Sequence, residues 1–240
     1  MRVADGGSLE HVAATWQQLG KDDPLWAVLT RPDRRRSWDL QEFLATGRAK
    51  VADTLAAVTA TTGWDGPYGD ALDFGCGVGR LTRALSERFA TVTGVDIAES
   101  MLERAREINA DRPNCRFVHN QRADLSTFED ESFDFVLSAI TLQHIPPDAA
   151  LGYIGEFVRV LRPVGIAVFE TALASRRQRV KQLLPRSLVV AFRHARDRDH
   201  LRMEMFPLRS AEAAEAVAAS GGRIVHRDYL DHGWRYFVRR

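Results

Sequence analysis

Residues 71–82 read ALDFGCGVGRLT, an apolar run that ends in glycines at alternate positions. The mainly apolar residues 71–74 predict a short buried strand, and the apolar spacing after Gly79 predicts a helix. Glycines at the carboxyl end of a first strand let the backbone turn tightly and approach a ligand closely. The stretch therefore predicts a binding crevice at one end of an α/β sheet. Turn glycines without a ligand are the alternative interpretation.

Strands and helices alternate on the carboxyl side of this stretch. Apolar runs predict strands over 71–74, 91–95, 116–118, 133–138 and 166–170, with helical stripes between most of them. Parallel neighbours need crossover connections, so this order predicts a doubly wound, mainly parallel sheet. Two later runs, 223–229 and 234–238, are joined by a short turn and must pair as a hairpin. We expect the hairpin to close the sheet with one antiparallel strand.

The flanking segments predict a helical cap and a late helix. Asp39, followed by Glu42, is typical of a helix start, and Ser210 can cap a helix that ends at Gly221. The pattern favours a single domain of 1–240 in four parts. These are a cap over 1–62, a core over 70–171, a weakly periodic basic insertion over 172–206, and a helix and hairpin over 207–240.

Composition indicates an ordinary globular protein. Hydrophobic residues make up 45% and charged residues 27% of the 240 residues, and the formal charge is +1. Cys76 and Cys115 provide neither a disulfide framework nor metal-site spacing. No run approaches the roughly 18 apolar residues that span a bilayer. We expect a cytoplasmic protein without membrane or nucleic-acid partners, in which the arginine runs 34–36 and 176–181 are solvated or contact anions. The sequence predicts no oligomeric state.

Two acidic residues define the chemistry of the glycine loop. A dinucleotide fold prefers G-x-G-x-x-G, whereas this chain has G-x-G-x-G, with Asp73 two residues before its first glycine. A carboxylate there repels pyrophosphate and suits an amino group. Asp96 closes the second strand, where it can accept hydrogen bonds from both hydroxyls of a ribose. It can also cap the helix that starts near Ser100, and the two roles are compatible. A cationic nucleoside cofactor is favoured over a dinucleotide.

Four motifs in order resemble those of class I, type 11 S-adenosylmethionine-dependent methyltransferases. They are the opening stretch, Gly94-Val95-Asp96, FDFVLS at 133–138 and RVLRP at 159–163. The resemblance covers about residues 70–171. It implies a seven-stranded Rossmann-like sheet whose first loop binds S-adenosylmethionine and releases S-adenosylhomocysteine. The cofactor contacts that it implies are Asp73, Gly75 and Gly77 at the methionine end, with Cys76 in the same loop, Asp96 at the ribose, and Ile97 and Met101 at the adenine.

The resemblance has two departures. The adenine-contacting motif corresponds to NQRADL at 120–125, but Gln121 stands where the family often has Asp. The alignment of this stretch with the family motif can shift by a few residues, and the alignment that we favour puts Ala123, Asp124 and Leu125 at the adenine. Val164 replaces a common glycine. Outside the motifs, Arg48 is a further candidate of the cofactor site, as a cation that reaches a carboxylate.

The acceptor side is indicated by SAITLQHIPP at 138–147. A sulfonium is a good leaving group, so most of the task is to hold donor and nucleophile in line. No metal is expected, and Mg²⁺ has no support in the sequence. A hydroxyl acceptor needs a base, and His144 has the right basicity near neutral pH. The alternative is a structural histidine beside an apolar segment, the interpretation that we favour for the other histidines.

The acceptor itself is predicted from short motifs. WDLQEF at 38–43 and LQHIPP resemble actinobacterial sugar O-methyltransferases of the methylmannose polysaccharide kind. We therefore expect O-methylation of a small polar acceptor, a sugar or oligosaccharide, in polysaccharide biosynthesis, beneath a lid made by the cap and the insertion. The alternatives are a quinone, phenol or other secondary metabolite, which requires a more apolar lid, and a cofactor-binding or RNA-associated protein that is not an enzyme.

Overall fold

The computed structural model describes residues 8–173, 203–231 and 233–240. Seven strands form one sheet in the order β3-β2-β1-β4-β5-β7-β6. Neighbours from β3 to β5 are parallel, and β7 runs antiparallel to both β5 and β6. The predicted doubly wound sheet with one antiparallel strand is confirmed. The strands are β1 Asp70–Phe74, β2 Thr91–Asp96, β3 Cys115–His119, β4 Phe133–Ser138, β5 Leu161–Ala172, β6 Arg223–Leu230 and β7 Gly233–Arg239.

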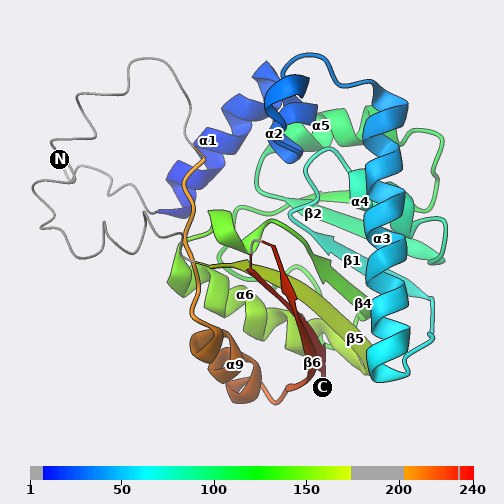
Figure 1. Ribbon diagram of the computed structural model, residues 1–240, viewed down its shortest axis with the longest axis vertical. Coiled ribbons are helices and arrows are strands. Elements are labelled where there is room, and N and C mark those ends of the chain that lie inside the picture. Colours follow the sequence, from blue (N-terminus) through cyan, green and yellow to red (C-terminus); the bar gives the residue numbers. More distant parts are fainter. Residues whose placement is uncertain (1–7, 174–202, 232) are drawn as a thin grey trace, which may run out of the picture.

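Helices cover both faces of the sheet (Figure 1). One face packs against α6 and α9 through a core that includes Phe157 and Tyr236. The opposite face packs against α3 and α4 through Leu55, Leu85 and Phe135. A third cluster packs the N-terminal cap, with α1, α2 and the start of α3, against α5. The helices are α1 Leu9–Asp22, α2 Pro24–Val28, α3 Leu40–Thr62, α4 Arg80–Leu85, α5 Glu99–Ile108, α6 Pro147–Val160 and α9 Ser210–Ala219, with 3₁₀ turns η1 Pro32–Arg34 and η2 Leu142–His144.

The helix boundaries test the capping predictions. Asp39 Oδ1 accepts the Glu42 N–H at 2.8 Å, and α3 ends at Gly63, whose φ of 68° is left-handed. The predicted start of α3 is therefore confirmed. The prediction for α9 was wrong by one residue, because Arg209 is the N-cap and Ser210 is already helical. The Glu212 side chain accepts the Arg209 N–H at 3.1 Å, which provides the cap in place of Ser210.

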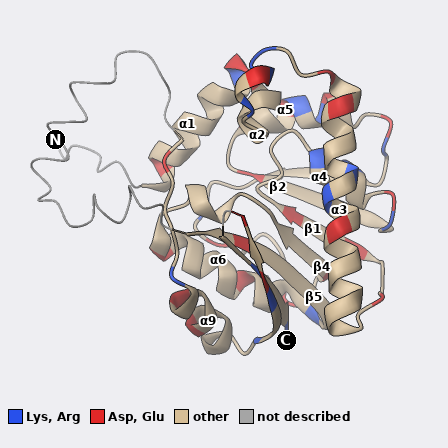
Figure 2. Cartoon of the chain, in the orientation of Figure 1, with Lys and Arg blue, Asp and Glu red and all other residues tan. Residues whose placement is uncertain are grey.

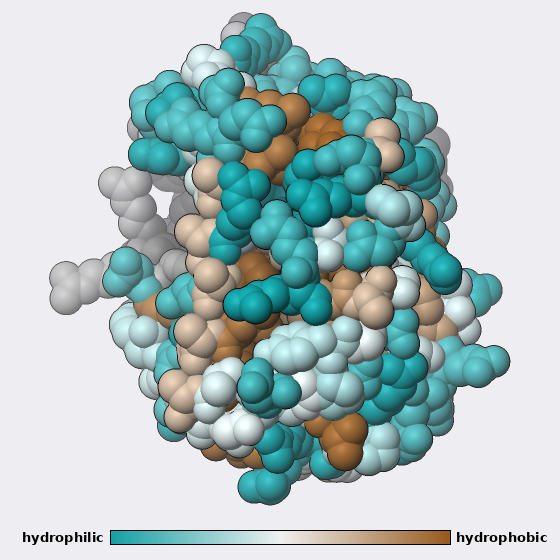
Figure 3. Space-filling model, turned by 90° about the vertical axis from the view of Figure 1, so that its right-hand side faces the viewer, coloured by the Kyte–Doolittle hydropathy of each residue, from teal (hydrophilic) through white to brown (hydrophobic). Residues whose placement is uncertain are grey.

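Charges of both signs are interspersed over the surface. Both acidic and basic residues lie along α3 (Figure 2), and the face that carries α3 is mostly hydrophilic, with apolar areas separated from one another (Figure 3). Within the first arginine run, Arg34 pairs with Glu42 at 2.5 Å and Arg36 with Asp22 at 2.6 Å. The second run, 176–181, lies outside the described residues. In the part of the chain that the structure describes, no helix is long and apolar enough to cross a membrane.

Candidate active site

A cavity of about 300 Å³ lies where β1, β2 and β4 end. The carboxyl ends of parallel strands meet at one edge of a sheet, so the loops that follow them converge there. The loop after β1, the end of β2 and the segment from Ala139 to Ile145 after β4 all reach the cavity. The predicted site residues that line it are Asp73, Gly75, Cys76, Gly77, Asp96, Ile97 and His144.

The backbone of the glycine loop, at Gly75 and Gly77, leaves no room for a side chain. Gly75 and Gly77 have φ values of 74° and 53°, in the left-handed region. A Cβ on Gly75 would lie 2.1 Å from Thr141 Cγ2, and one on Gly77 would lie 2.5 Å from Val28 Cγ2. Glycine therefore lets the loop after β4 and the cap helix α2 approach the β1 loop closely.

Asp96 joins the glycine loop to the start of α5. One carboxylate oxygen accepts the Gly77 N–H at 2.8 Å, and the other accepts the Ala98 N–H at 2.9 Å. Burial raises the pKa of this carboxyl. The structural role that the sequence offered as an alternative is therefore present. Each carboxylate oxygen keeps a further lone pair, so the ribose contact stays a prediction compatible with this role.

Asp73 and Arg80 place opposite charges on the cavity wall. Asp73 is 1% exposed, and its Oδ2 accepts the Thr82 hydroxyl at 2.6 Å. Burial raises the pKa of Asp73 to about 6. Arg80 begins α4, lines the cavity and is 5% exposed. Sequence reasoning missed Arg80, although its position directly after the last loop glycine was an available signal.

His144 is fixed by contacts to both ring nitrogens. Its Nδ1 lies 2.9 Å from the Glu204 carbonyl oxygen, which only accepts, so Nδ1 carries the proton. Nε2 is then an acceptor and lies 3.2 Å from the Gln143 amide nitrogen. The edge of the Trp16 ring packs against the imidazole at a centroid distance of 5.2 Å. Burial lowers the pKa of His144, which favours the neutral form.

One part of the cavity wall is apolar, and its residue Trp16 packs against His144. This part consists of side chains from α1 and from the short segment before α9, namely Leu9, Val12, Trp16, Met203 and Met205. The Phe206 N–H donates to the Gln143 carbonyl at 2.6 Å, which ties that segment to η2. Sequence reasoning missed these five residues. Of the predicted lid, the cap and residues 203–206 are present here, whereas 176–200 lie outside the described residues.

Five predicted cofactor residues do not line the cavity. Met101 is fully buried in the cap cluster, and Arg48 is exposed on α3. In the loop after β3, Ala123 and Asp124 are exposed and Leu125 is fully buried. Asn120 lines the cavity instead. The structure therefore does not bring the favoured adenine frame to the cavity, and its contact with the cofactor stays a prediction.

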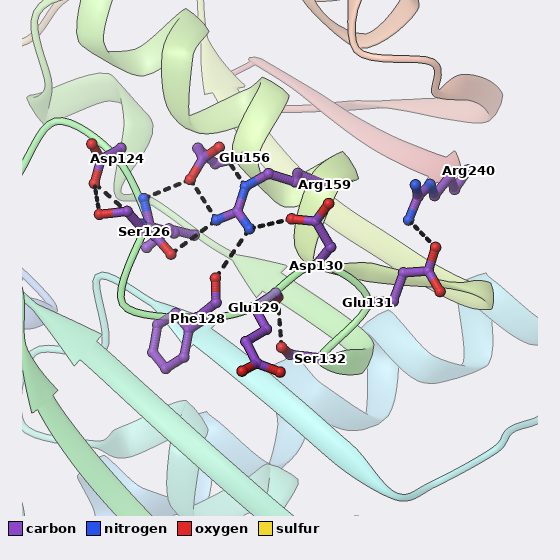
Figure 4. Close-up of polar contacts among 11 residues, drawn as sticks. Asp124, Ser126, Phe128, Glu129, Asp130, Glu131, Ser132, Glu156, Arg159 and Arg240 are labelled. Carbon is purple, nitrogen blue, oxygen red and sulfur yellow. Dashed lines mark hydrogen bonds and ion pairs between the residues drawn. The ribbon is translucent and has the colours of Figure 1, made fainter.

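The loop after β3 is anchored to α6 (Figure 4). Arg159 donates to the carbonyls of Leu125 and Phe128 at 2.9 and 3.0 Å, and it pairs with Asp130 at 2.7 Å. Glu156 accepts the Leu125 N–H at 2.8 Å. Both backbone polar groups of Leu125 are thus hydrogen-bonded to side chains of α6. The first residue of the RVLRP motif serves here to hold the β3–β4 loop in place.

Metal ligands do not gather in the described ranges. Within residues 8–173, 203–231 and 233–240, no group of three or more His, Cys, Asp or Glu side chains could hold a metal ion.

Comparisons with known proteins agree with the fold and with the loop. Residues 71–165 match the family described as a methyltransferase domain. A demethylmenaquinone methyltransferase of Staphylococcus aureus is 41% identical over 101 residues, which are 41% of this chain and 41% of that protein. The chain thus matches about two fifths of that relative's length.

Two solved structures share the fold over nearly the whole chain. A SAM-dependent methyltransferase from Leishmania major has a TM-score of 0.65 at 14% identity, covering 99% of this chain and 87% of that one. Magnesium protoporphyrin IX methyltransferase from Synechocystis, solved with bound SAH, has a TM-score of 0.62 at 18% identity, covering 97% and 100%. Together with the sheet order, this likeness shows a Rossmann-like methyltransferase fold.

Proposed function

Starting from residues 71–165 as a methyltransferase domain of the class I, S-adenosylmethionine-dependent kind, we propose that this chain methylates a phenol or hydroquinone. The observation that carries the proposal is that one cavity is lined both by acids of the glycine-loop region and by apolar side chains. Asp73 and Asp96 are the acids, and Trp16, one of the apolar residues, packs against His144. This arrangement suits a charged nucleoside donor that meets an apolar acceptor.

The residues at the glycine loop fit S-adenosylmethionine. When bound, S-adenosylmethionine supplies a methyl group on a sulfonium, which leaves readily as the thioether of S-adenosylhomocysteine. Asp96 has lone pairs for the ribose hydroxyls, and Asp73 provides a buried carboxylate for the α-ammonium group. The left-handed Gly75 and Gly77 allow the backbone to approach the donor without a Cβ between them.

The apolar wall favours an aromatic acceptor over a sugar. Leu9, Val12, Trp16, Met203 and Met205 present almost no hydrogen-bonding groups, and sugar hydroxyls buried against them would lose their water without replacement. Ring systems gain from such a surface, and methionine sulfur packs well against aromatic faces. The name of the Staphylococcus relative also indicates a quinone-type substrate for that protein. The polysaccharide acceptor expected from short motifs has less support.

We propose His144 as the general base. With the proton on Nδ1 held by the Glu204 carbonyl, Nε2 has the lone pair that can take a phenolic proton. The Gln143 amide now bonded to Nε2 has to move aside or donate to the acceptor instead. As the acceptor O–H bond yields its proton to Nε2, the new bond to the methyl carbon forms and the carbon–sulfur bond breaks. A histidine base suits a phenolic acceptor, because the phenolic hydroxyl has a pKa near 10 and gives up its proton readily.

Methyl transfer from labelled S-adenosylmethionine tests the proposal. The purified chain is incubated with the labelled donor and with matched acceptors: a naphthohydroquinone, a simple phenol and a mannose oligosaccharide. We expect label in the aromatic products and release of S-adenosylhomocysteine in equal amount. Label in the oligosaccharide alone would reject the aromatic acceptor, and failure to bind the donor at all would reject the methyltransferase.

A further inference from the structure

Gln143 places a buried amide next to the imidazole of His144. It lies in η2, lines the cavity and is 8% exposed. Because Nδ1 of His144 carries the proton, the Gln143 amide nitrogen donates to Nε2, at 3.2 Å. The amide oxygen of Gln143 has no hydrogen-bond partner among the described residues. In this part of the chain, one hydrogen bond thus holds the amide, and that bond goes to the proposed base.

The backbone keeps the two side chains next to each other. The Phe206 N–H donates to the Gln143 carbonyl at 2.6 Å, which fixes η2. The imidazole of His144 is held by the Glu204 carbonyl at 2.9 Å and packs against the Trp16 ring at a centroid distance of 5.2 Å. It cannot turn away from the amide without losing these contacts. An acceptor that reaches Nε2 of His144 therefore meets the amide of Gln143 as well.

The reacting hydroxyl has to take the place of the amide at Nε2. A buried N–H group that loses its acceptor in this way costs free energy unless it finds another. Oxygens on adjacent carbons of an aromatic ring lie about one hydrogen-bond length apart, close to the 3.2 Å between the two side-chain nitrogens. A second oxygen at that position can accept the displaced N–H. An oxygen further around the ring lies too far from the first for both contacts.

We propose that Gln143 selects an aromatic acceptor that carries oxygens on two adjacent ring carbons, one of which receives the methyl group. The inference rests on the proposed function and deepens it, since it names the substrate class of the same cavity. The reacting hydroxyl gives its proton to His144 Nε2, its oxygen bonds to the methyl carbon, and the carbon–sulfur bond of the donor breaks. The neighbouring oxygen accepts the Gln143 N–H and stays unchanged, so a hydroxyl or a carbonyl oxygen can serve.

Methyl transfer to the three isomers of dihydroxybenzene tests the inference. Catechol, resorcinol and hydroquinone have the same size and the same two hydroxyls, but catechol alone has them on adjacent carbons. With S-adenosylmethionine as donor and under reducing conditions, we expect kcat/KM for catechol to exceed that for either other isomer at least about tenfold, the equivalent of one hydrogen bond. Gln143→Met keeps the length of the side chain without the amide and should remove most of this preference. Its affinity for S-adenosylhomocysteine, measured by calorimetry, should stay near that of the parent.

Gln41→Met is the matched control, because Gln41 is exposed on α3 and does not line the cavity. It should leave the preference for catechol unchanged. An equal or higher kcat/KM of the parent protein for resorcinol or hydroquinone, or a preference for catechol that persists in folded Gln143→Met, would overturn the role of Gln143 alone. If the parent bound S-adenosylhomocysteine but methylated none of the three isomers, the aromatic acceptor of the proposed function would fall, so the two failures are distinguishable.

Discussion

At the scale of single residues, we expect Asp73 to make cofactor binding depend on pH. Burial raises its pKa to about 6, and only the ionised carboxylate attracts the ammonium group of the donor. Affinity for S-adenosylhomocysteine should therefore rise as the pH increases through about 6 and fall on acidification. Calorimetry between about pH 5 and 8 measures this, with Asp73→Asn expected to bind weakly and with a flat profile. A parent protein whose affinity did not change across that range would contradict the role of Asp73.

His144 gives a second prediction, in which burial shifts the pKa downward and not upward as it does for Asp73. Burial lowers this pKa from the usual 6.5, so the imidazole stays neutral and able to accept a proton in moderately acidic solution. The acidic limb of kcat should lie below pH 6.5 for that reason. His144→Ala should lower kcat by roughly 10²-fold while the affinity for the donor stays near that of the parent.

The control for this variant is His226→Ala, which removes a histidine bonded to Asp228 on β6 and should leave turnover unchanged. A His144→Ala enzyme with full turnover would show that the imidazole only fills space against Trp16.

The site residues that the sequence identified are those whose roles follow from local geometry. Gly75, Gly77, Asp73 and Asp96 follow directly from a loop between a strand and a helix. Arg80 was missed because helical spacing does not say that an arginine at the first turn points inward, against Gly47 of a helix more than thirty residues earlier. Tertiary packing alone decides its burial.

At the scale of helices, Gly20 sets how closely α1 approaches α5. Ser100 donates its hydroxyl to the Gln17 carbonyl at 2.8 Å. A Cβ on Gly20 would lie 2.3 Å from Ser100 Oγ and 3.1 Å from the Met101 backbone nitrogen. Gly20→Ala should therefore push α1 outward and displace Trp16 from the cavity. We expect kcat/KM for the acceptor to fall more than the affinity for the donor does.

Gly152→Ala in α6 is the matched control for Gly20→Ala. The nearest atom to its added Cβ is 3.8 Å away, so the change should stabilise the helix by about 1 kcal/mol, as alanine does in an open helix position. Kinetic measurements and thermal unfolding on both variants separate the two effects. If Gly20→Ala behaved like Gly152→Ala, the position of α1 would not control acceptor turnover.

The positions of the strands and helices could largely be predicted from the sequence, whereas the long-range contacts of their side chains could not. Strand and helix periodicity placed the five parallel strands within a few residues, apart from the extension of β5 back to Leu161. The periodicity of α1 indicates one buried face, but it does not reveal that Val12 and Trp16 line a cavity. The frame of the loop after β3 was also beyond reach, because its anchoring by Arg159 is a long-range contact without a periodic signal.

At the scale of the whole molecule, the donor should stabilise the fold. A ligand that binds only the native state at about 100 times its Kd contributes about 2.7 kcal/mol, which raises Tm by roughly 5 to 10 °C for a domain of this size. S-adenosylhomocysteine should produce such a shift in thermal unfolding. NAD should produce none, because Asp73 beside the glycine loop repels its pyrophosphate. A shift with NAD equal to that with S-adenosylhomocysteine would contradict the donor assignment.

The place of β7 in the sheet has a consequence for synthesis on the ribosome. This strand comes after β6 in the chain but lies between β5 and β6, with Tyr236, Phe237 and Val238 almost completely buried. A nascent chain that has not yet emerged past residue 233 therefore presents β5 as an open edge, with the apolar run Ile166–Phe169 beside it. Such edges template pairing with other chains. Incomplete chains on one messenger RNA are thus more prone to associate with each other than finished chains are. Contact with chaperones should therefore matter most before β7 emerges.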